Sequence, residues 1–228
     1  MINQRYEIKF ALNESEVTHA LSWLANINAK KKYPDRIVNS LYFDNLNQEA
    51  IRDNLAGNTP RHKIRLRWYG DDKTNILNPN LEIKTKNGRL GSKILYPLKI
   101  NKKLIKTKSI YTISNDIFNE IYCSNFHHIA INEYLVPMLI VKYNREYFEK
   151  SNGIRITIDN KICFLNANQN LRIGLLKPSS YNFYVMEIKF SQELKHSVAK
   201  LIRVLHLTPK RFSKYLVGLA MFGYASYI

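Results

Sequence analysis

The sequence predicts an α+β fold in which about eight antiparallel strands curl into a barrel, with a basic lumen and amphipathic helices packed outside. Most candidate strands alternate apolar and polar residues, which is typical of strands that bury one face. The polar faces carry mainly Arg and Lys, and a curled sheet would gather them around an enclosed space. Turn signals separate several strands, which favours antiparallel pairing. We expect residues 1–228 to form one such domain.

The expected strands are short segments with a period of two. In residues 61–70, RHKIRLRWYG, three apolar side chains share one parity and three cations share the other. The cations are Lys63, Arg65 and Arg67. Five other segments have the same habit: RYEIKF, LEIKTK, IVKYNREYF, GIRITIDN and VMEIKF. We expect strands over residues 4–11, 37–43, 61–69, 80–86, 92–99, 138–149, 154–165 and 183–190.

Amphipathic helices are expected between the strands, where apolar residues recur every three to four positions. The first begins at Asn13, which with Glu16 forms the start of a capping box. The others are expected after Asp44-Asn45 as far as Gly57, from Ser114, over residues 191–206 and over residues 212–225. Residues 99–108, KINKKLIKTK, are expected to form a basic loop.

The composition indicates a folded protein with an anionic partner. Lys and Arg number 35 against 18 Asp and Glu, which gives a formal net charge of +17, and hydrophobic residues make up 45% of the chain. Nucleic acid, an anionic membrane or a polyphosphate would each relieve this charge. Cys123 and Cys163 match no metal-ligand or redox spacing, so we expect reduced core thiols. We see no signal peptide or membrane span and expect a cytoplasmic protein, for which a membrane-protein partner is possible.

The repeated cationic face has two interpretations. Any half-exposed antiparallel sheet alternates polar and apolar residues, so one such strand proves nothing. Here several strands offer mostly Arg and Lys, and like charges about 5 Å apart repel by roughly 1 kcal/mol in water and by several at an effective dielectric near 20. A bound polyanion would relieve that cost. Guanidinium groups also form forked contacts with phosphate oxygens, which draws attention to Arg65, Arg67, Arg145 and Arg155.

Two carboxylates stand among these cations. Glu7 and Glu187 could neutralise a neighbouring Lys across the sheet. They could equally hold a divalent ion that also touches phosphate, and Mg²⁺ or Mn²⁺ suits oxygen ligands of this kind. The residues alone leave both roles open.

Eight motifs occur in an order that resembles one known family. They are RYEIKF, SLYFDN, IRLRWYG, LEIKTKNG, VKYNREYF, RITIDNKI, VMEIKF and RFSKYLVGL. Together they resemble the VTC domain, the catalytic domain of the vacuolar transporter chaperone polyphosphate polymerase. That domain is a branch of the triphosphate tunnel metalloenzymes, which are related to the CYTH proteins. The resemblance implies a barrel that binds triphosphates, uses Mn²⁺ or Mg²⁺, and transfers the γ-phosphoryl group of a nucleoside triphosphate, expected to be ATP, onto inorganic polyphosphate.

The resemblance also implies roles for individual residues. Those expected at the reacting phosphates are Lys9, Arg65, Arg67, Lys84, Arg145, Arg155 and Lys189. Those expected to bind the rest of the substrate are Lys93, Arg211 and Lys214, and we add Lys86 because it shares the charged parity of Lys84. The expected metal ligands are Glu187 and Glu7. The chain departs from the family where Arg211 replaces the usual Lys, and where Arg5-x-Glu7-x-Lys9 replaces the Glu-x-Glu-x-Lys of many tunnel enzymes.

Phosphoryl transfer needs alignment and cationic stabilisation but no side-chain nucleophile, which agrees with the absence of any Ser-His-Asp or Cys-His arrangement in the sequence. The loss of one carboxylate at Arg5 favours the polymerase over the hydrolase branch. The alternatives are a metal-dependent tripolyphosphatase or nucleoside triphosphatase of the same fold and, from another class, a non-enzymatic polyanion-binding or RNA-binding protein. We expect nucleoside triphosphate and polyphosphate, and no nucleic acid, as partners.

Overall fold

The described part of the chain is built around one curled antiparallel sheet. The computed structural model describes residues 5–70, 77–88, 90–99, 105, 107–124 and 126–225. Across the sheet the order is β1 (Tyr6–Leu12), β9 (Tyr184–Phe190), β7 (Arg155–Asn166), β6 (Leu135–Glu149), β2 (Lys30–Asn45), β3 (Arg61–Tyr69), β4 (Leu77–Asn87) and β5 (Leu90–Pro97), and β8 (Ser179–Tyr181) pairs with β7. Every pairing is antiparallel.

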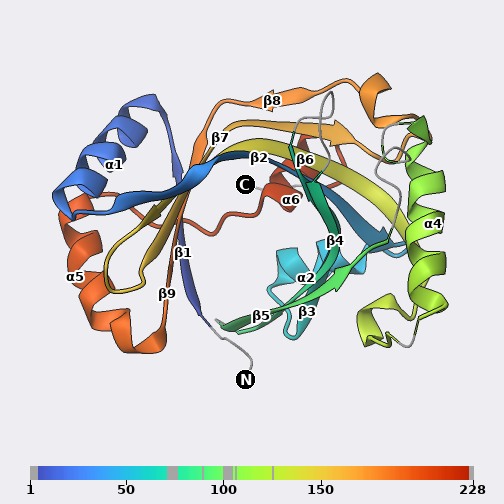
Figure 1. Cartoon of the computed structure of the whole chain (residues 1–228), viewed down its shortest axis with the longest axis horizontal. Helices are drawn as coiled ribbons and strands as arrows, with labels where there is room; N and C mark the ends of the chain where they lie inside the picture. The colour runs from blue at the N-terminus through green and yellow to red at the C-terminus, as the bar shows by residue number, and fades with distance from the viewer. Residues whose placement is uncertain are drawn as a thin grey trace.

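The curl brings the two ends of this order together. Figure 1 shows β1 and β5 approaching each other on the lower side of the molecule, and a bridge between Arg5 and Gly91 connects them. The structure therefore confirms the predicted α+β fold with its curled antiparallel sheet. The eight predicted strands are all present, with ends that differ by a few residues, and β2 is much longer than expected.

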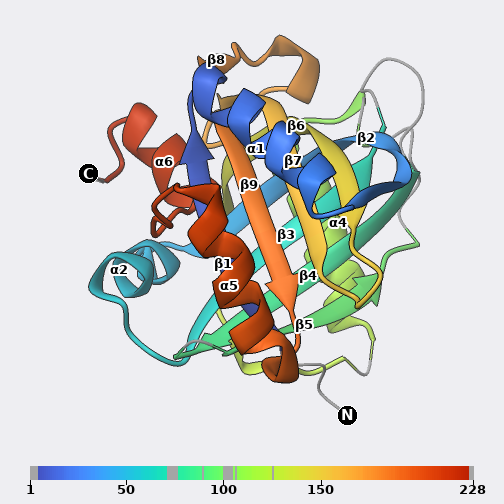
Figure 2. The same cartoon turned by 90° about the vertical axis from the view of Figure 1, so that its left-hand side faces the viewer.

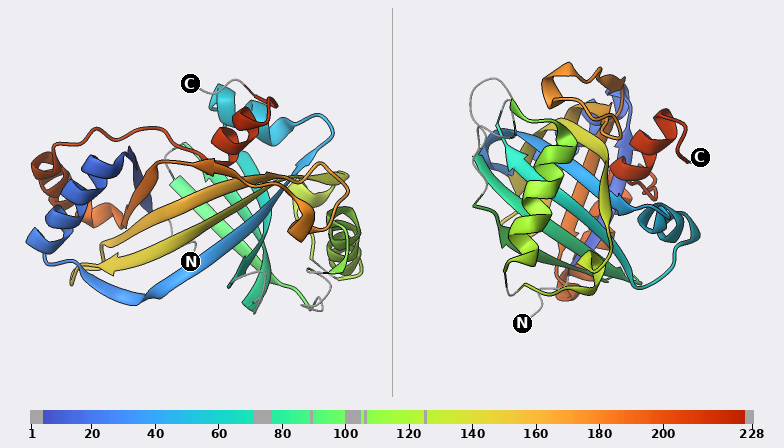
Figure 3. Two further views of the ribbon diagram at one scale, coloured as in Figure 1. Left: turned by 90° about the horizontal axis from the view of Figure 1, so that it is seen from above. Right: turned by 90° about the vertical axis from the view of Figure 1, so that its right-hand side faces the viewer.

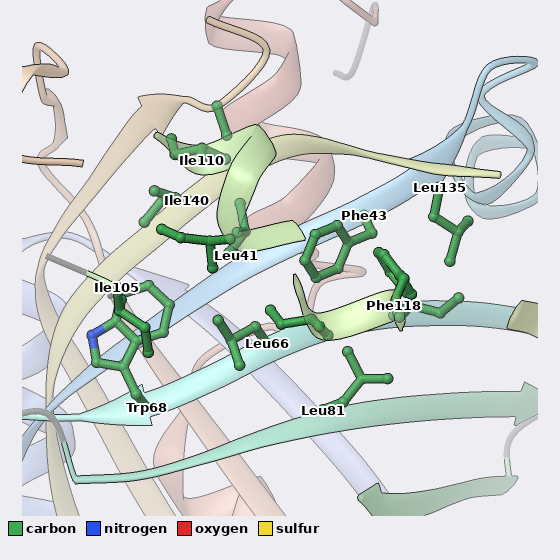
Figure 4. Close-up of a cluster of buried hydrophobic side chains, with 14 of the residues drawn as sticks. Leu41, Phe43, Leu66, Trp68, Leu81, Ile105, Ile110, Phe118, Leu135 and Ile140 are labelled. Atoms are coloured by element: carbon green, nitrogen blue, oxygen red, sulfur yellow. The ribbon is translucent and has the colours of Figure 1, made fainter. Parts of the chain in front are cut away.

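The two faces of the sheet differ in chemistry, as the alternation predicts. Leu66 and Trp68 of β3 are fully buried in an apolar cluster under the helix α4 (Ile110–Tyr122), which lies on the outside of the barrel (Figure 4). The side chains of Arg65 and Arg67, which alternate with these two residues, lie on the opposite, concave face and contact Glu82 and Ser40. The apolar parity thus forms the outer core and the basic parity faces inward.

Helices cover the outside and one end of the barrel. In Figure 2, α1 (Glu14–Asn26) and α5 (Lys195–Leu205) lie in front of β9 and β7, and their apolar residues share a cluster with β1, β7 and β9. The Asn13–Glu16 capping box at the start of α1 is confirmed. α2 (Glu49–Ala56) and α6 (Lys214–Met221) lie side by side at one end of the barrel (Figures 1 and 3), and they share a second apolar cluster.

Some expectations were wrong at the level of single elements. The third helix begins after Ser109, not at Ser114, because the Ser109 side chain caps it and the Ser114 hydroxyl donates to the Ile110 carbonyl inside the helix. Cys163 is half-buried, but Cys123 is exposed at the end of α4 and is no core thiol; neither is in a disulfide.

Other segments were missed or lie outside the described residues. The first part of β2 and the three-residue β8 were missed, since residues 30–36 are exposed and show no apolar alternation. Most of the expected basic loop at 99–108 lies outside the described residues. Among the described helices, none combines the length and apolar character that a membrane crossing requires.

Candidate phosphate-binding cavity

A cationic cavity lies on the concave side of the sheet. Its volume is about 150 Å³, and among the described residues ten basic and two acidic side chains line it. The lining residues are Glu7, Lys9, Asn54, Arg61, Lys63, Arg65, Arg67, Lys84, Lys86, Tyr143, Arg145, Glu187, Lys189, Ser213 and Lys214. A second cavity of about 410 Å³ shares several of these residues and extends towards α2, Lys210 and Arg211. The cations predicted from the alternation therefore converge on one space.

Arg65 and Arg67 are held by a buried carboxylate on the neighbouring strand. Both Nε and Nη2 of Arg65 donate to Glu82 Oε2, at 2.8 and 2.6 Å, and Nη1 donates to the Tyr42 hydroxyl at 2.9 Å. Arg67 donates to Ser40 Oγ at 3.2 and 3.1 Å and lies 3.5 Å from Glu82. Burial would raise the pKa of Glu82, but Arg65 and Arg67 outweigh it and lower that pKa to about 2. Glu82 therefore stays charged and fixes both guanidinium groups.

A second buried carboxylate holds Arg145 and Lys214 on the other side of the cavity. Arg145 Nε and Nη2 donate to the two oxygens of Asp159 at 2.6 and 2.8 Å, and Lys214 Nζ donates to Oδ2 at 2.5 Å. Asp159 has no exposed surface. Burial would raise its pKa, yet Arg145 and Lys214 lower it below the usual value. This network connects β6 and β7 to the start of α6.

Glu7 and Glu187 form the acidic part of the cavity. The β1–β9 register places Glu7 opposite Lys189 and Lys9 opposite Glu187. Glu7 contacts Lys9 Nζ at 2.8 Å and Lys84 Nζ at 3.1 Å, and Glu187 contacts Lys189 Nζ at 2.9 Å. Burial and the charge of Glu187 oppose ionisation of Glu7, but Lys9 and Lys84 outweigh them and lower the pKa of Glu7. Burial opposes ionisation of Glu187, but Lys189, Lys9 and Arg145 lower its pKa well below the usual value.

These two carboxylates fit a divalent ion as part of a larger ligand set. No group of three or more His, Cys, Asp or Glu residues in the described part of the chain could hold a metal. Two ionised carboxylates suit Mg²⁺ or Mn²⁺, which commonly bind one or two protein carboxylates and take further oxygens from phosphate and water. Both roles left open by the sequence are thus compatible with the geometry, since each carboxylate also neutralises a Lys.

Most of the predicted site residues come together here. Glu7, Lys9, Arg65, Arg67, Lys84, Lys86, Arg145, Glu187, Lys189 and Lys214 all line the smaller cavity, and Arg211 lines the larger one. Lys93 lines neither, but its Nζ lies 3.4 Å from Glu82 and its side chain is about half exposed. Arg155 is exposed at the first position of β7 and also lies outside both cavities.

Several residues of the site received no role from the sequence. Glu82 and Asp159 were noticed only as members of charged parities, because their function depends on which cations lie across the strand pair. Lys63 shares the parity of Arg65 and could have been included on that ground. Asn54 lies on α2 and carries no strand signal, so its arrival at the cavity required the tertiary structure.

A curled antiparallel sheet with an inner face of Arg, Lys and Glu defines the triphosphate tunnel class of folds. Comparison with known proteins agrees with this. The model of the VTC domain family matches residues 4–223, and the chain belongs to that family.

Solved structures with low identity show the same fold. HpAC1 from Hippeastrum, for which a dominant triphosphatase activity is described, has 13% identity and a TM-score of 0.52, and the match covers 95% of this chain and 96% of that one. PH1012 from Pyrococcus horikoshii OT3 has 12% identity and a TM-score of 0.54, with 94% and 98% covered. A conserved hypothetical protein from Pyrococcus furiosus has 12% identity and a TM-score of 0.53, with 94% and 99% covered.

Proposed function

We propose that this protein is a polyphosphate polymerase that transfers the γ-phosphoryl group of a nucleoside triphosphate, ATP in the first instance, onto a growing polyphosphate chain. The observation that carries the proposal is the inward-facing set of ten basic side chains around a narrow cavity, with two carboxylates in their midst. Such a space suits a slender chain of phosphates. Membership of the VTC domain family supports the same substrate class.

In the proposed reaction, a terminal oxygen of polyphosphate attacks the γ-phosphorus, the bond from that phosphorus to the β–γ bridging oxygen breaks, and nucleoside diphosphate leaves. The transition state is loose, with charge on the nonbridging oxygens, so fixed cations stabilise it. Arg65 and Arg67 would align one side of the chain, and Arg145 and Lys189 the other. Glu82 and Asp159 hold three of these groups in position before substrate arrives, which limits reorganisation during the reaction.

Glu187 and Glu7 would hold Mn²⁺ or Mg²⁺. When bound, the ion would neutralise negative charge on the phosphate groups of the substrate. Lys9 and Lys84, which contact Glu7, would keep a phosphate group next to that position. Lys86 and Arg211 line the larger cavity and lie farther along the proposed path. Lys93 and Arg155 have no place in this arrangement because both lie outside the two cavities.

A hydrolase is the second candidate, because a triphosphatase activity is described for HpAC1, which shares the fold. Water would then attack in place of the polyphosphate end. A nucleic-acid binder is less compatible, since the basic parity faces a cavity of about 150 Å³ that is too narrow for a duplex.

The experiment is product analysis after incubation with γ-labelled ATP and Mn²⁺. The proposal predicts a ladder of polyphosphate chains on a gel, whereas orthophosphate alone would identify the hydrolase. The double variant R65K/R67K keeps both positive charges beside the buried Glu82 but removes the forked guanidinium contacts, so it should stay folded and make at least tenfold less product. R172K/R203K is the matched control, because it makes the same exchange at two exposed positions and should leave the ladder intact.

A further inference from the structure

Lys63 differs in its partners from Lys9, Lys84, Lys189 and Lys214, which line the same cavity. Lys9 and Lys84 contact Glu7, Lys189 contacts Glu187, and Lys214 contacts Asp159. Lys63 Nζ donates to Ser213 Oγ at 3.0 Å and lies 5.9 Å from the centre of the Tyr215 ring. It makes no ion pair with any carboxylate in the described part of the chain.

The surroundings of Lys63 are basic on several sides. Arg61 and Arg65 flank it on β3, and Lys84 of β4 is directly opposite in the strand register. Lys9 of β1 adds a further cation to its electrostatic environment. Burial and these four cations lower the pKa of Lys63 well below its ordinary value. While the cavity holds no anion, Lys63 therefore gives up its proton more readily than an ordinary lysine does.

A second group that lines this cavity has an unsatisfied hydrogen-bond donor. Asn54 of α2 is about nine-tenths buried, and its Nδ2 has no acceptor among the described residues. An unsatisfied buried donor is costly, and a ligand oxygen would satisfy it. Since Asn54 and Lys63 line one cavity of about 150 Å³, an oxyanion there would meet both an amide donor and an amine.

We propose that Lys63 is a further substrate-binding residue, and that it takes up one proton from solvent when a triphosphate or polyphosphate chain enters the cavity. This inference rests on the proposed function, because it requires a phosphate chain in this space. The entering chain supplies the negative charge that Lys63 lacks, and the resulting ammonium group donates to a nonbridging phosphate oxygen. The groups facing Lys63 are Arg61 and Arg65 of β3, Lys84 of β4, Lys9 of β1, Ser213 and Tyr215 of the α6 segment, and the uncharged Asn54 of α2.

The other cations of the cavity do not fill this role equally. Burial also lowers the pKa values of Lys84 and Lys86, but less than that of Lys63. Lys214 is already paired with the buried Asp159 at 2.5 Å before substrate binds. Arg61, on the same strand as Lys63, is a guanidinium and remains protonated throughout the accessible pH range. A change in proton number on binding that depends on position 63 is thus a specific signature.

The test is calorimetric titration of the full chain with inorganic tripolyphosphate, with EDTA present so that no metal-dependent turnover occurs. The titrations are done at about pH 8 in HEPES and in Tris, which differ in their heat of ionisation. The difference between the two measured binding heats gives the number of protons that the complex takes up from the buffer. The terminal phosphates of tripolyphosphate also exchange protons near this pH, and they do so in wild type and variants alike, so the result is the difference in proton number between wild type and variant. Wild type should take up more protons than K63R, by up to one per site, whereas K195R, at an exposed position of α5, should match wild type.

K63R keeps the charge but cannot release the proton, so it should still bind tripolyphosphate. The affinity of K63R for tripolyphosphate should depend less on pH than that of wild type. In the pH range where Lys63 changes charge, the slopes of log affinity against pH should differ by up to one. K63M should lose the extra uptake and bind at least tenfold more weakly. If K63R does not fold, K63M carries the proton measurement alone. Equal uptake by wild type and the position-63 variant overturns the inference, whereas absence of tripolyphosphate binding by wild type overturns the proposed function itself.

Discussion

Replacing Asp159 by Asn should strongly destabilise the protein. The substitution keeps the shape of the side chain but removes the charge that holds Arg145 at 2.6 and 2.8 Å and Lys214 at 2.5 Å. Asp159 is fully buried, so the two cations would be left without their counter-charge in a site that already contains many cations. Removing one partner from a buried ion pair costs about 3–5 kcal/mol.

Urea denaturation would measure this loss directly. For a chain of this length, about 3–5 kcal/mol corresponds to a fall in melting temperature of roughly 6–20 °C. Tripolyphosphate should recover more stability in D159N than in wild type, because its charge replaces that of the missing carboxylate near Arg145. The control is D116N, whose ion pair with Lys108 at 2.9 Å is about one-third exposed and should contribute at most about 1 kcal/mol. If D159N were as stable as D116N, the ion pairs of Asp159 with Arg145 and Lys214 would not stabilise the folded protein.

Three further outcomes are expected. The pKa of Glu82 is lowered from 4.5 to about 2 in the folded protein. Its carboxylate therefore stabilises the folded state fully above pH 4.5, and this contribution is lost as the pH falls towards 2. The free energy of unfolding should vary less over that pH range in E82Q than in wild type. G218A should lower stability by about 1–3 kcal/mol in the same urea assay, because the added Cβ would lie 2.6 Å from side-chain atoms of Leu139 and Phe164, whereas G174A, with open space around it, should be neutral. EDTA should abolish phosphoryl transfer and Mn²⁺ restore it, and E187Q should need more Mn²⁺ for half-maximal initial rate; full activity in EDTA would exclude a metal role for Glu187.

Side-chain alternation made much of the fold and site predictable from the sequence. In β3, Leu66 and Arg67 are neighbours, and a strand necessarily sends them to opposite faces. One face of β3 is buried under α4 and the other lines the cavity. The alternation of apolar and polar residues is therefore enough to distinguish the core residues of this strand from its cavity residues. The inward placement of Arg145 on β6 and Glu187 on β9 follows from the same rule.

The interactions that depend on register and tertiary packing could not be read in this way. Asp159 acts on Arg145 because β6 and β7 pair in one register, and no local pattern specifies that register. Arg155 shares the parity of Asp159, yet it lies outside the cavities because it is the first residue of β7. Asn54 reaches the cavity from a helix at the end of the barrel, which only the packing of α2 determines.

A structure of the protein with tripolyphosphate and Mn²⁺ would show whether phosphate binds inside the barrel. We expect a phosphate chain there, with its oxygens between Arg65 and Arg67 on one side and Arg145 and Lys189 on the other, and with Mn²⁺ at Glu187. Tripolyphosphate bound only on the outer surface, with no phosphate density between these side chains, would contradict this expectation.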